Sequence, residues 1–303
     1  MRWTPLPEQL HALVADTPDS VLLETSRFDA ENRRSFVFLD AVETIAVRRL
    51  DEIPELFRRI EEALAAGLYA AGFLGYECGY HFERFDDVSF APQELPLAWF
   101  GVYREPMVFD HGRGCFDGEF GFSLTDAPAG ERHVLFGDRE TLEMGEEDYC
   151  AQIQRIKEYI RAGETYQVNF TDKIRIQMKA AAGAAFGALV RRQPVAYSAL
   201  LHVEGQHILS LSPELFFRVE GGRIVTRPMK GTMHRGLDCA EDVAAAARLG
   251  NDEKNRAEHV MIVDLLRNDL GRICEMGSVR VEDIFSVERY RTLLQMTSTV
   301  SGK

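Results

Sequence analysis

The sequence predicts an α+β fold, in which antiparallel strands are combined with amphipathic helices. Two segments, residues 52–67 and 146–163, carry apolar side chains at helical spacing, and each ends at a glycine. Many shorter runs are rich in β-branched and aromatic residues, a composition typical of strands. Two of these runs are joined by Gly221-Gly222, and a pair of residues that tolerates positive φ predicts a β-hairpin with antiparallel strands.

The composition is that of a soluble globular protein with one large domain or two coupled ones. The chain has 303 residues, of which 46% are hydrophobic and 27% charged. Its net charge of −13 argues against a nucleic-acid-binding surface, which needs clustered Lys and Arg. No apolar run has the length of a membrane span, and the five cysteines are far apart with no Cys-x-x-Cys pair. Reduced thiols and a cytoplasmic location are therefore expected.

Residues 1–135 are predicted to form an N-terminal region of strands and one helix. The runs at 20–26 and 35–40 have the composition of strands. Residues 52–67 form the predicted helix, in which apolar side chains recur at helical spacing until Gly67 stops it. The glycine-rich run at 69–80 is predicted to be a buried strand.

A second region, residues 146–303, begins where the character of the chain changes. Its first helix ends at Gly163 and carries an apolar stripe formed by Tyr149, Ile153, Ile156 and Ile160. The following run, residues 165–178, alternates strictly and is predicted to be a strand. Its polar row, which includes Gln167, is either the solvated side of a sheet or the wet lining of a pocket.

The stretch "RPMKGT", residues 227–232, follows the returning strand of the predicted hairpin. It places Lys230 in a tight turn, although lysine usually lies on a solvated surface. Glu214 lies at the start of the outgoing strand, just after a break at Pro213. Hairpin topology therefore predicts that Glu214 and Lys230 lie near each other.

The last predicted helix begins at a cap formed by Asn251 or Asp252. Glu258 lies on the edge of its apolar face, where it is either a solvated rim residue or, if buried, a residue that needs a cation or metal. After this helix the chain ends in a predicted strand. The expected apolar face consists of Met261, Ile262, Leu265 and Leu266.

These stretches resemble the chorismate-utilising enzymes, and most closely the first components of aminodeoxychorismate synthases. The resemblance is carried by "AGETYQVNFT", by "AYSALLHVEGQHILSLSPELFFRVEGGRIVTRPMKGT", by "DEKNRAEHVMIVDLLRNDLGRI" and by "VERYRTLLQMTSTVSG". Together these runs cover most of residues 146–303. The N-terminal runs "VLLETS" and "GFLGYECGY" are similar to the family but less diagnostic. The resemblance implies antiparallel β-sheets packed face to face, flanking helices, and an active site in the cleft between the sheets.

The resemblance also implies an amino-transferring synthase in which three side chains carry the chemistry. Glu258 would be one ligand of a Mg²⁺ that binds the ring carboxylate of chorismate. Glu214 would protonate the departing C4 hydroxyl, a role that burial would favour because it stabilises the neutral acid. Lys230 would attack ring carbon C2 as an uncharged amine, and ammonia would then displace it by adding at C4.

Two positions distinguish the members of the family from one another. Anthranilate synthases carry a small residue where this chain has Lys230, and isochorismate- and salicylate-forming relatives carry a lysine where it has Gln167. The combination found here implies that ammonia adds at C4 to give 4-amino-4-deoxychorismate for para-aminobenzoate and folate synthesis. Gly231 and Thr232 of the same turn are assigned to substrate binding.

The partner implied is a glutamine amidotransferase subunit, because this chain has no glutaminase nucleophile pattern. The runner-up enzyme is anthranilate synthase component I. A third reading, from a different class, is an inactive module that holds an amino acid or docks the amidotransferase.

Relatives in the family bind tryptophan between the "LLE" strand and a segment that here reads "AYS". The resemblance therefore implies a structural or regulatory tryptophan site formed by Glu24, Thr25, Tyr197 and Ser198. Relatives also continue with a glycine-rich segment, an arginine-bearing strand and a helix with a second metal-binding glutamate. The chain is thus expected to be a fragment of a longer protein, with a sheet edge exposed where further strands would pair.

Overall fold

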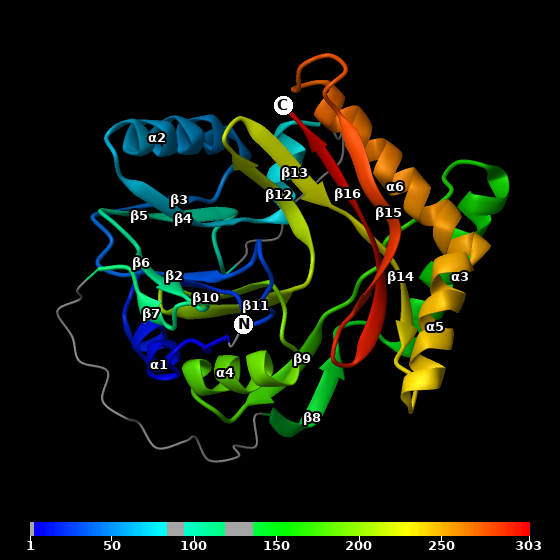
Figure 1. Ribbon diagram of the computed structural model, residues 1–303, viewed down its shortest axis with the longest axis horizontal. Coiled ribbons are helices and arrows are strands. Elements are labelled where there is room, and N and C mark those ends of the chain that lie inside the picture. Colours follow the sequence, from blue (N-terminus) through cyan, green and yellow to red (C-terminus); the bar gives the residue numbers. More distant parts are fainter. Residues whose placement is uncertain (1–2, 84–93, 119–135) are drawn as a thin grey trace.

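The computed structural model describes residues 3–83, 94–118 and 136–303. It has an α+β fold in which antiparallel sheets carry helices on their outer faces (Figure 1), as predicted. Every strand pair among these residues is antiparallel. In the same part of the chain, no helix combines the length and the apolar character needed to cross a lipid bilayer.

A six-stranded sheet joins segments that lie far apart in the sequence. Its order is β11-β10-β1-β2-β6-β7, and helices α1 and α4 pack against it through a core that includes Leu10, Leu22 and Phe186. Because β1 pairs with β10, the predicted boundary between residues 135 and 146 does not separate two sheets. The elements are α1 (Gln9–Asp16), β1 (Ser20–Glu24), β2 (Arg34–Phe38), β6 (Met107–Asp110), β7 (Cys115–Phe116), α4 (Ala182–Arg192), β10 (Tyr197–Val203) and β11 (Gln206–Ser212).

A three-stranded sheet packs face to face on the six-stranded one. The two sheets share a core in which Val21 and Phe38 meet Trp99 and Tyr103. Gly72 of β4 is required here, because a Cβ at this position would lie 1.9 Å from the carbonyl oxygen of Trp99. The elements are β3 (Glu43–Val47), η1 (Leu50–Glu52), α2 (Ile53–Ala65), β4 (Tyr69–Leu74), η2 (Tyr76–His81) and β5 (Ala98–Tyr103), in the sheet order β3-β5-β4.

The prediction of a buried strand over residues 69–80 is only half correct. Strand β4 ends at Leu74, the 3-10 helix η2 follows, and within 69–80 the buried residues are Ala71 and Cys78. The physical reason is that β4 lies at the edge of its sheet, where Tyr69 and Leu74 face solvent.

A five-stranded sheet forms the third layer and carries two helices on one face (Figure 1). The predicted hairpin is confirmed, since Gly221 and Gly222 connect β12 and β13 with φ of 56° and 75°. The sheet contains β12 (Leu215–Glu220), β13 (Arg223–Arg227), β14 (Met229–His234), β15 (Arg280–Arg289) and β16 (Leu293–Gly302), and its helices are α5 (Cys239–Asn251) and α6 (Glu253–Gly271).

Helix α6 begins at its predicted cap and buries a face that overlaps the expected one only in part. The Asp252 side chain accepts the Asn255 N–H at 2.8 Å. The buried residues are His259, Val263 and Leu270, which pack toward β16, whereas Leu265 is 54% exposed. The predicted face was half right: Ile262 and Leu266 are half-buried, and Leu266 packs against this core, whereas Met261 and Leu265 are exposed. Hydrophobicity alone did not identify His259 as a core residue.

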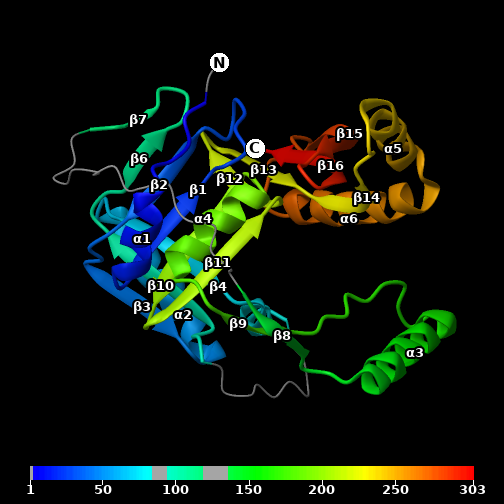
Figure 2. The ribbon, with the colours of Figure 1, turned by 90° about the horizontal axis from the view of Figure 1, so that it is seen from below.

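The segment containing α3 (Glu146–Ala162) stands apart from the sheets. It is flanked by β8 (Phe136–Leu142) and β9 (Ile174–Met178), which pair with each other, and Figure 2 shows α3 well separated from α5 and α6. Gly163 ends the helix with φ 78°, as predicted. However, none of the side chains of α3, a helix described along its whole length, is buried. The predicted apolar stripe is therefore only partly covered: the Tyr149 ring lies 5.5 Å from that of Phe170, and Ile153 and Ile156 are half-buried.

The strand predicted over 165–178 is also mostly wrong. Residues 165–173 are irregular, and the strand β9 contains only the last five residues of that range. Alternation along residues 165–173 therefore did not produce a ladder, because a strand also requires a neighbour, and within the described residues only β8 pairs with this segment.

Asp242 connects α5 to two strands and provides a test of stability against pH. It accepts from Arg235 Nε at 2.5 Å, from Arg289 Nε at 3.2 Å and from the Gly236 N–H at 3.2 Å. The Arg235 guanidinium and these other donors lower the pKa of this carboxyl from 3.8 to about 2. Its stabilising effect is therefore fully present above the ordinary pKa and is lost as the pH falls through about 2.

We expect Asp242→Asn to lower the urea midpoint of unfolding at neutral pH. The difference from the unaltered protein should shrink as the pH approaches 2, where the carboxyl loses its charge in both states. Asp264→Asn is the matched control, because Asp264 pairs with Arg267 on an exposed helix surface. A midpoint difference that stays constant with pH would contradict the prediction.

Candidate active site

Lys230 lies on the helix-covered face of the five-stranded sheet. It is half-buried in β14, directly opposite Met296 of β16. Directly opposed residues share a face of a sheet, and Met296 is fully buried beneath α5. The next residue, Gly231, has φ 78° and interrupts the register between the two strands. This is a left-handed conformation that favours glycine. The predicted tight turn at Lys230 is therefore wrong: Lys230 lies within strand β14, and the positive φ of Gly231 produces a register irregularity there.

Glu214 is bonded to the backbone immediately before Lys230. It lies on the short connection from β11 of the six-stranded sheet to β12 of the five-stranded sheet. Its Oε1 accepts the N–H of Met229 at 3.1 Å. The expectation that hairpin topology brings Glu214 near Lys230 therefore agrees with this contact. Glu214 itself is exposed, so the described residues do not supply the burial expected for an acid that must hold its proton.

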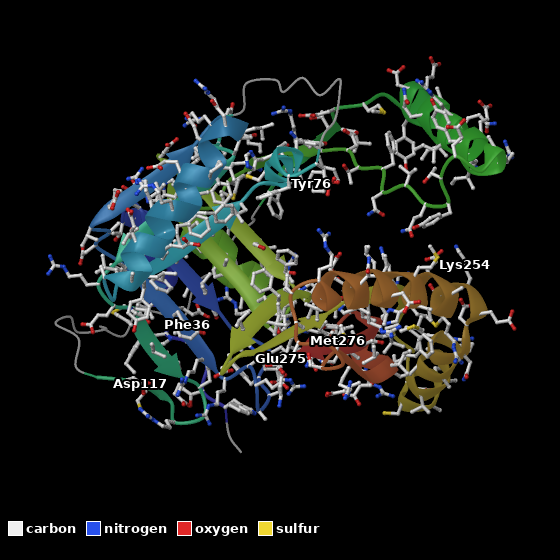
Figure 3. The ribbon with its side chains drawn as sticks, turned by 90° about the horizontal axis from the view of Figure 1, so that it is seen from above. Phe36, Tyr76, Asp117, Lys254, Glu275 and Met276 are labelled. Carbon is white, nitrogen blue, oxygen red and sulfur yellow. The ribbon has the colours of Figure 1, made fainter. Side chains whose placement is uncertain are left out.

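Helix α6 brings Glu258 to the same part of the sheet. A Cβ on Gly231 would lie 3.1 Å from side-chain atoms of Asn255, so β14 and α6 are in close contact there. Glu258 is three residues further along and lies on the same side of the helix. Its side chain is 39% exposed, and its Oε1 is 3.8 Å from Nζ of Lys254, which is labelled in Figure 3. Within the described ranges, no ion pair joins Lys230 to either glutamate.

The residues fit a metal site to which the protein contributes one carboxylate. Among the described residues, no three Asp, Glu, His or Cys side chains are grouped so as to hold a metal ion. Mg²⁺, however, is often bound through one or two carboxylates together with an anionic substrate and water. Glu258 is accessible and carries an oxygen ligand of the right kind, so it can supply one position of such a site.

The structure brings Thr232 close to Lys230 but leaves Gln167 apart. The hydroxyl of Thr232 donates to Oε1 of Gln295 on the neighbouring strand at 2.9 Å. Gln167 lies in the irregular segment after α3, where its amide is 3.5 Å from Oδ1 of Asn169. That segment is separated from β14 and α6 in Figure 2.

A small apolar cluster, missed in the sequence, joins the two sheets beside the site. It contains Val195 and Leu211 from the six-stranded side and Met229, Tyr290 and Leu293 from the five-stranded side. The guanidinium of Arg27 stacks over the Tyr290 ring at 4.2 Å and pairs with Glu288. These contacts hold Met229, and therefore the Glu214 carboxylate, in place between the sheets.

All four residues predicted to bind tryptophan line a cavity of about 900 Å³, which is separate from the surroundings of Lys230. The pairing of β1 with β10 sets Glu24 opposite Ser198, and the Thr25 hydroxyl donates to the carbonyl of Ala196 at 2.9 Å. Tyr197 Oη and Ser198 Oγ are buried, and neither has a partner among the described residues. Burial also raises the pKa of the Tyr197 hydroxyl. Unpaired buried polar atoms of this kind are rare and costly in folded proteins.

Two histidines behind this cavity were missed in the sequence. His11 Nε2 is 2.7 Å from Oε2 of Glu24. His111 Nδ1 is 2.7 Å from the carbonyl of Thr4, so Nδ1 carries the proton and Nε2 accepts the hydroxyl of Ser35, also at 2.7 Å. Burial lowers the pKa of His111. Ser35 in turn accepts the N–H of Thr25 at 3.0 Å, so this chain of bonds fixes the wall of the cavity.

Comparison with known proteins agrees with this arrangement. A family model described as chorismate binding enzyme matches residues 19–303. Aminodeoxychorismate synthase component 1 of Klebsiella aerogenes is 34% identical over 246 residues, which are 77% of this chain and 54% of that protein. The corresponding protein of Escherichia coli K12 is 33% identical, with coverage of 77% and 53%. The chain thus spans about half the length of these relatives.

Anthranilate synthases are similar as well. Anthranilate synthase component 1 3 of Haloarcula marismortui is 38% identical over 184 residues, covering 59% of this chain and 37% of that protein. Among solved structures, anthranilate synthase component I of Streptococcus pneumoniae has a TM-score of 0.74 at 22% identity, covering 92% of this chain and 71% of that chain. At that identity the likeness extends to the fold alone. Together with the family model, which matches nearly the whole length, these findings establish that the chain belongs to the chorismate-binding enzyme family.

Proposed function

We propose that this chain carries out the chorismate-processing step of an aminodeoxychorismate synthase. Chorismate and ammonia would give 4-amino-4-deoxychorismate, which feeds para-aminobenzoate and folate synthesis. The main support is Lys230, a half-buried amine whose preceding residue donates its N–H to the carboxylate of Glu214. The similarity to component 1 of two aminodeoxychorismate synthases agrees with this choice.

The proposed reaction has two substitution steps. In the first, Nζ of Lys230 bonds to C2, both conjugated double bonds of the ring shift by one position, and the C4–O bond breaks. Glu214 gives its proton to the departing hydroxyl, which leaves as water. In the second, ammonia bonds to C4, both double bonds shift back, and the C2–Nζ bond breaks. The proton lost by the added ammonia returns to Glu214, so the sum is chorismate plus ammonia giving product plus water.

Glu258 is proposed to hold Mg²⁺ together with the substrate. When bound, the ion would neutralise the ring carboxylate of chorismate and favour the build-up of negative charge during substitution. The chain's own part is to present an accessible carboxylate from α6 next to the part of strand β14 that contains Lys230. Ammonia is proposed to come from a glutamine amidotransferase partner, as expected for the first component of a two-component synthase.

The test is to incubate the protein with chorismate, a magnesium salt and an ammonium salt, and to separate the products by mass. The proposal expects 4-amino-4-deoxychorismate with no release of pyruvate. Anthranilate with pyruvate would instead support anthranilate synthase, a second candidate favoured by the similarity to the Haloarcula protein. Binding of chorismate without any product would support the inactive module.

We further propose that the 900 Å³ cavity binds tryptophan, through Glu24, Thr25, Tyr197 and Ser198. The unpartnered Tyr197 and Ser198 hydroxyls support this, because an amino acid offers donors and acceptors for both. Tryptophan at about 100 times its Kd should stabilise the protein by about 2.7 kcal/mol, seen as a rise in Tm.

Ser198→Val should abolish most of this rise in Tm, because it removes the hydroxyl and fills part of the cavity. Ser210→Ala is the matched control, since Ser210 lies on the neighbouring strand β11 and is exposed. An equal rise in Tm in all three proteins would show that tryptophan binds elsewhere.

A further inference from the structure

A buried histidine next to Glu258 makes a hydrogen bond that the proposed chemistry does not use. His259 is fully buried, and its Nε2 lies 2.7 Å from Oγ of Ser298 on β16. Its other ring nitrogen, Nδ1, is also buried and has no partner among the described residues. An apolar side chain of similar shape would avoid this unpaired nitrogen, so packing alone does not account for a histidine here.

Ser298 connects three parts of the candidate site. Its Oγ accepts the N–H of Phe285 at 3.2 Å, at an irregularity in β15 where Phe285 has φ 60°. Its own N–H points to the carbonyl of Pro228 at 3.4 Å, two residues before Lys230. Because the oxygen already accepts from Phe285, the Ser298 hydroxyl is able to donate to His259 Nε2. A single serine thus links α6 to the strand that carries the lysine.

The position of His259 on α6 determines where the adjacent Glu258 lies. Consecutive residues on a helix are about 100° apart around its axis. If the His259 ring is held against the sheet, Glu258 must lie toward the flank of the helix. Asn255, one turn earlier on the same side as His259, contacts Gly231 and gives a second fixed point. The helix therefore cannot rotate without losing either this contact or the bond to Ser298.

We propose that His259 is a positioning residue for the metal-binding carboxylate. Its hydrogen bond to Ser298 fixes the rotation of α6 over β14 and so sets the place of Glu258 relative to Lys230. This inference rests on the proposed role of Glu258 in binding Mg²⁺ with chorismate. His259 touches neither substrate nor metal in this arrangement.

The test compares three variants in two measurements. His259→Phe keeps a ring but loses the bond, Ser298→Ala removes the other partner, and His259→Gln places an amide where Nε2 lies. The first measurement is calorimetric Mg²⁺ binding with chorismate present and ammonia absent. The second is the Tm. His259→Phe and Ser298→Ala should weaken Mg²⁺ binding about 10-fold, the lower end of the effect of losing a group that directly orients a metal ligand, because His259 acts on Glu258 only through the helix. His259→Gln should restore much of the affinity.

Val263→Ala is the matched control, because Val263 lies one turn further on the same buried face of α6. It should lower the Tm while leaving Mg²⁺ affinity close to that of the unaltered protein. Equal loss of Mg²⁺ affinity in Val263→Ala and His259→Phe would overturn the proposal, as would unchanged affinity in His259→Phe. The binding measurement needs no turnover, so it remains decisive for His259 even if no aminated product forms and the proposed function fails.

Discussion

Replacing Lys230 by alanine is expected to stop the formation of 4-amino-4-deoxychorismate. Without the lysine amine, residue 230 cannot form a bond to C2, so the covalent intermediate that ammonia displaces is lost. The substitution also leaves space next to C2, where ammonia itself could attack. The expected outcome is therefore a change of product toward anthranilate and pyruvate, measured by mass spectrometry after incubation with chorismate, Mg²⁺ and ammonium.

Two further variants make this result specific. Lys230→Met fills the same space without an amine and should give neither product. Lys157→Ala removes an exposed lysine of α3, which stands apart from the sheets, and should leave the product unchanged. Formation of 4-amino-4-deoxychorismate by Lys230→Ala at the original rate would exclude the covalent pathway.

Glu214→Gln is expected to lower kcat by about 10²–10⁴-fold, the usual contribution of a general acid. The amide keeps an oxygen that can accept the Met229 N–H, so the geometry beside Lys230 should be preserved. Because the lost proton transfer occurs during the reaction, the KM for chorismate should change little. Steady-state kinetics at saturating ammonium measures both quantities.

Glu220→Gln provides the comparison for Glu214→Gln, since Glu220 is an exposed glutamate at the far end of β12, the strand that follows Glu214. It should behave like the unaltered protein. If Glu214→Gln raised KM and kept kcat, Glu214 would be a binding residue, and another acid would have to protonate the leaving hydroxyl.

The sequence correctly predicted helix ends, helix caps and the hairpin, because their conformation depends on residues that are close together in the chain. Gly163 and the pair Gly221-Gly222 adopt the positive φ values expected for a helix end and a hairpin. Asp252 caps α6 through its own side chain. At each of these positions the conformation depends on residues within one turn of the chain, so the sequence pattern was sufficient.

Predictions that required knowledge of neighbouring elements were less successful. The apolar stripe of α3 was read correctly as helical, but none of its side chains is buried, and Tyr149 contacts Phe170 of the irregular segment rather than a sheet. On α6 the buried side chain at the centre of the face is His259, which a hydrophobic pattern does not select. Residues 165–173 alternate like a strand and yet pair with none of the strands described.

The candidate site divides in the same way. Lys230, Glu214 and Glu258 were found because each lies in a stretch that resembles the family. Their supporting residues were missed, because partners such as His259 and Ser298 are separated by 39 positions and bear no motif of their own. A hydrogen bond of this range depends on how α6 lies over the sheet, which a single sequence does not reveal.

The hydrogen bond between the Glu214 carboxylate and the Met229 N–H offers a way to measure how Glu214 is placed relative to Lys230. This amide proton joins the connection between β11 and β12 to strand β14. Its exchange with solvent should be slow while the hydrogen bond is intact and faster when the six-stranded and five-stranded sheets move apart. Measuring the exchange rate of that proton by NMR, with and without chorismate, would show whether substrate binding brings the two sheets together or whether they already have this arrangement in the free protein.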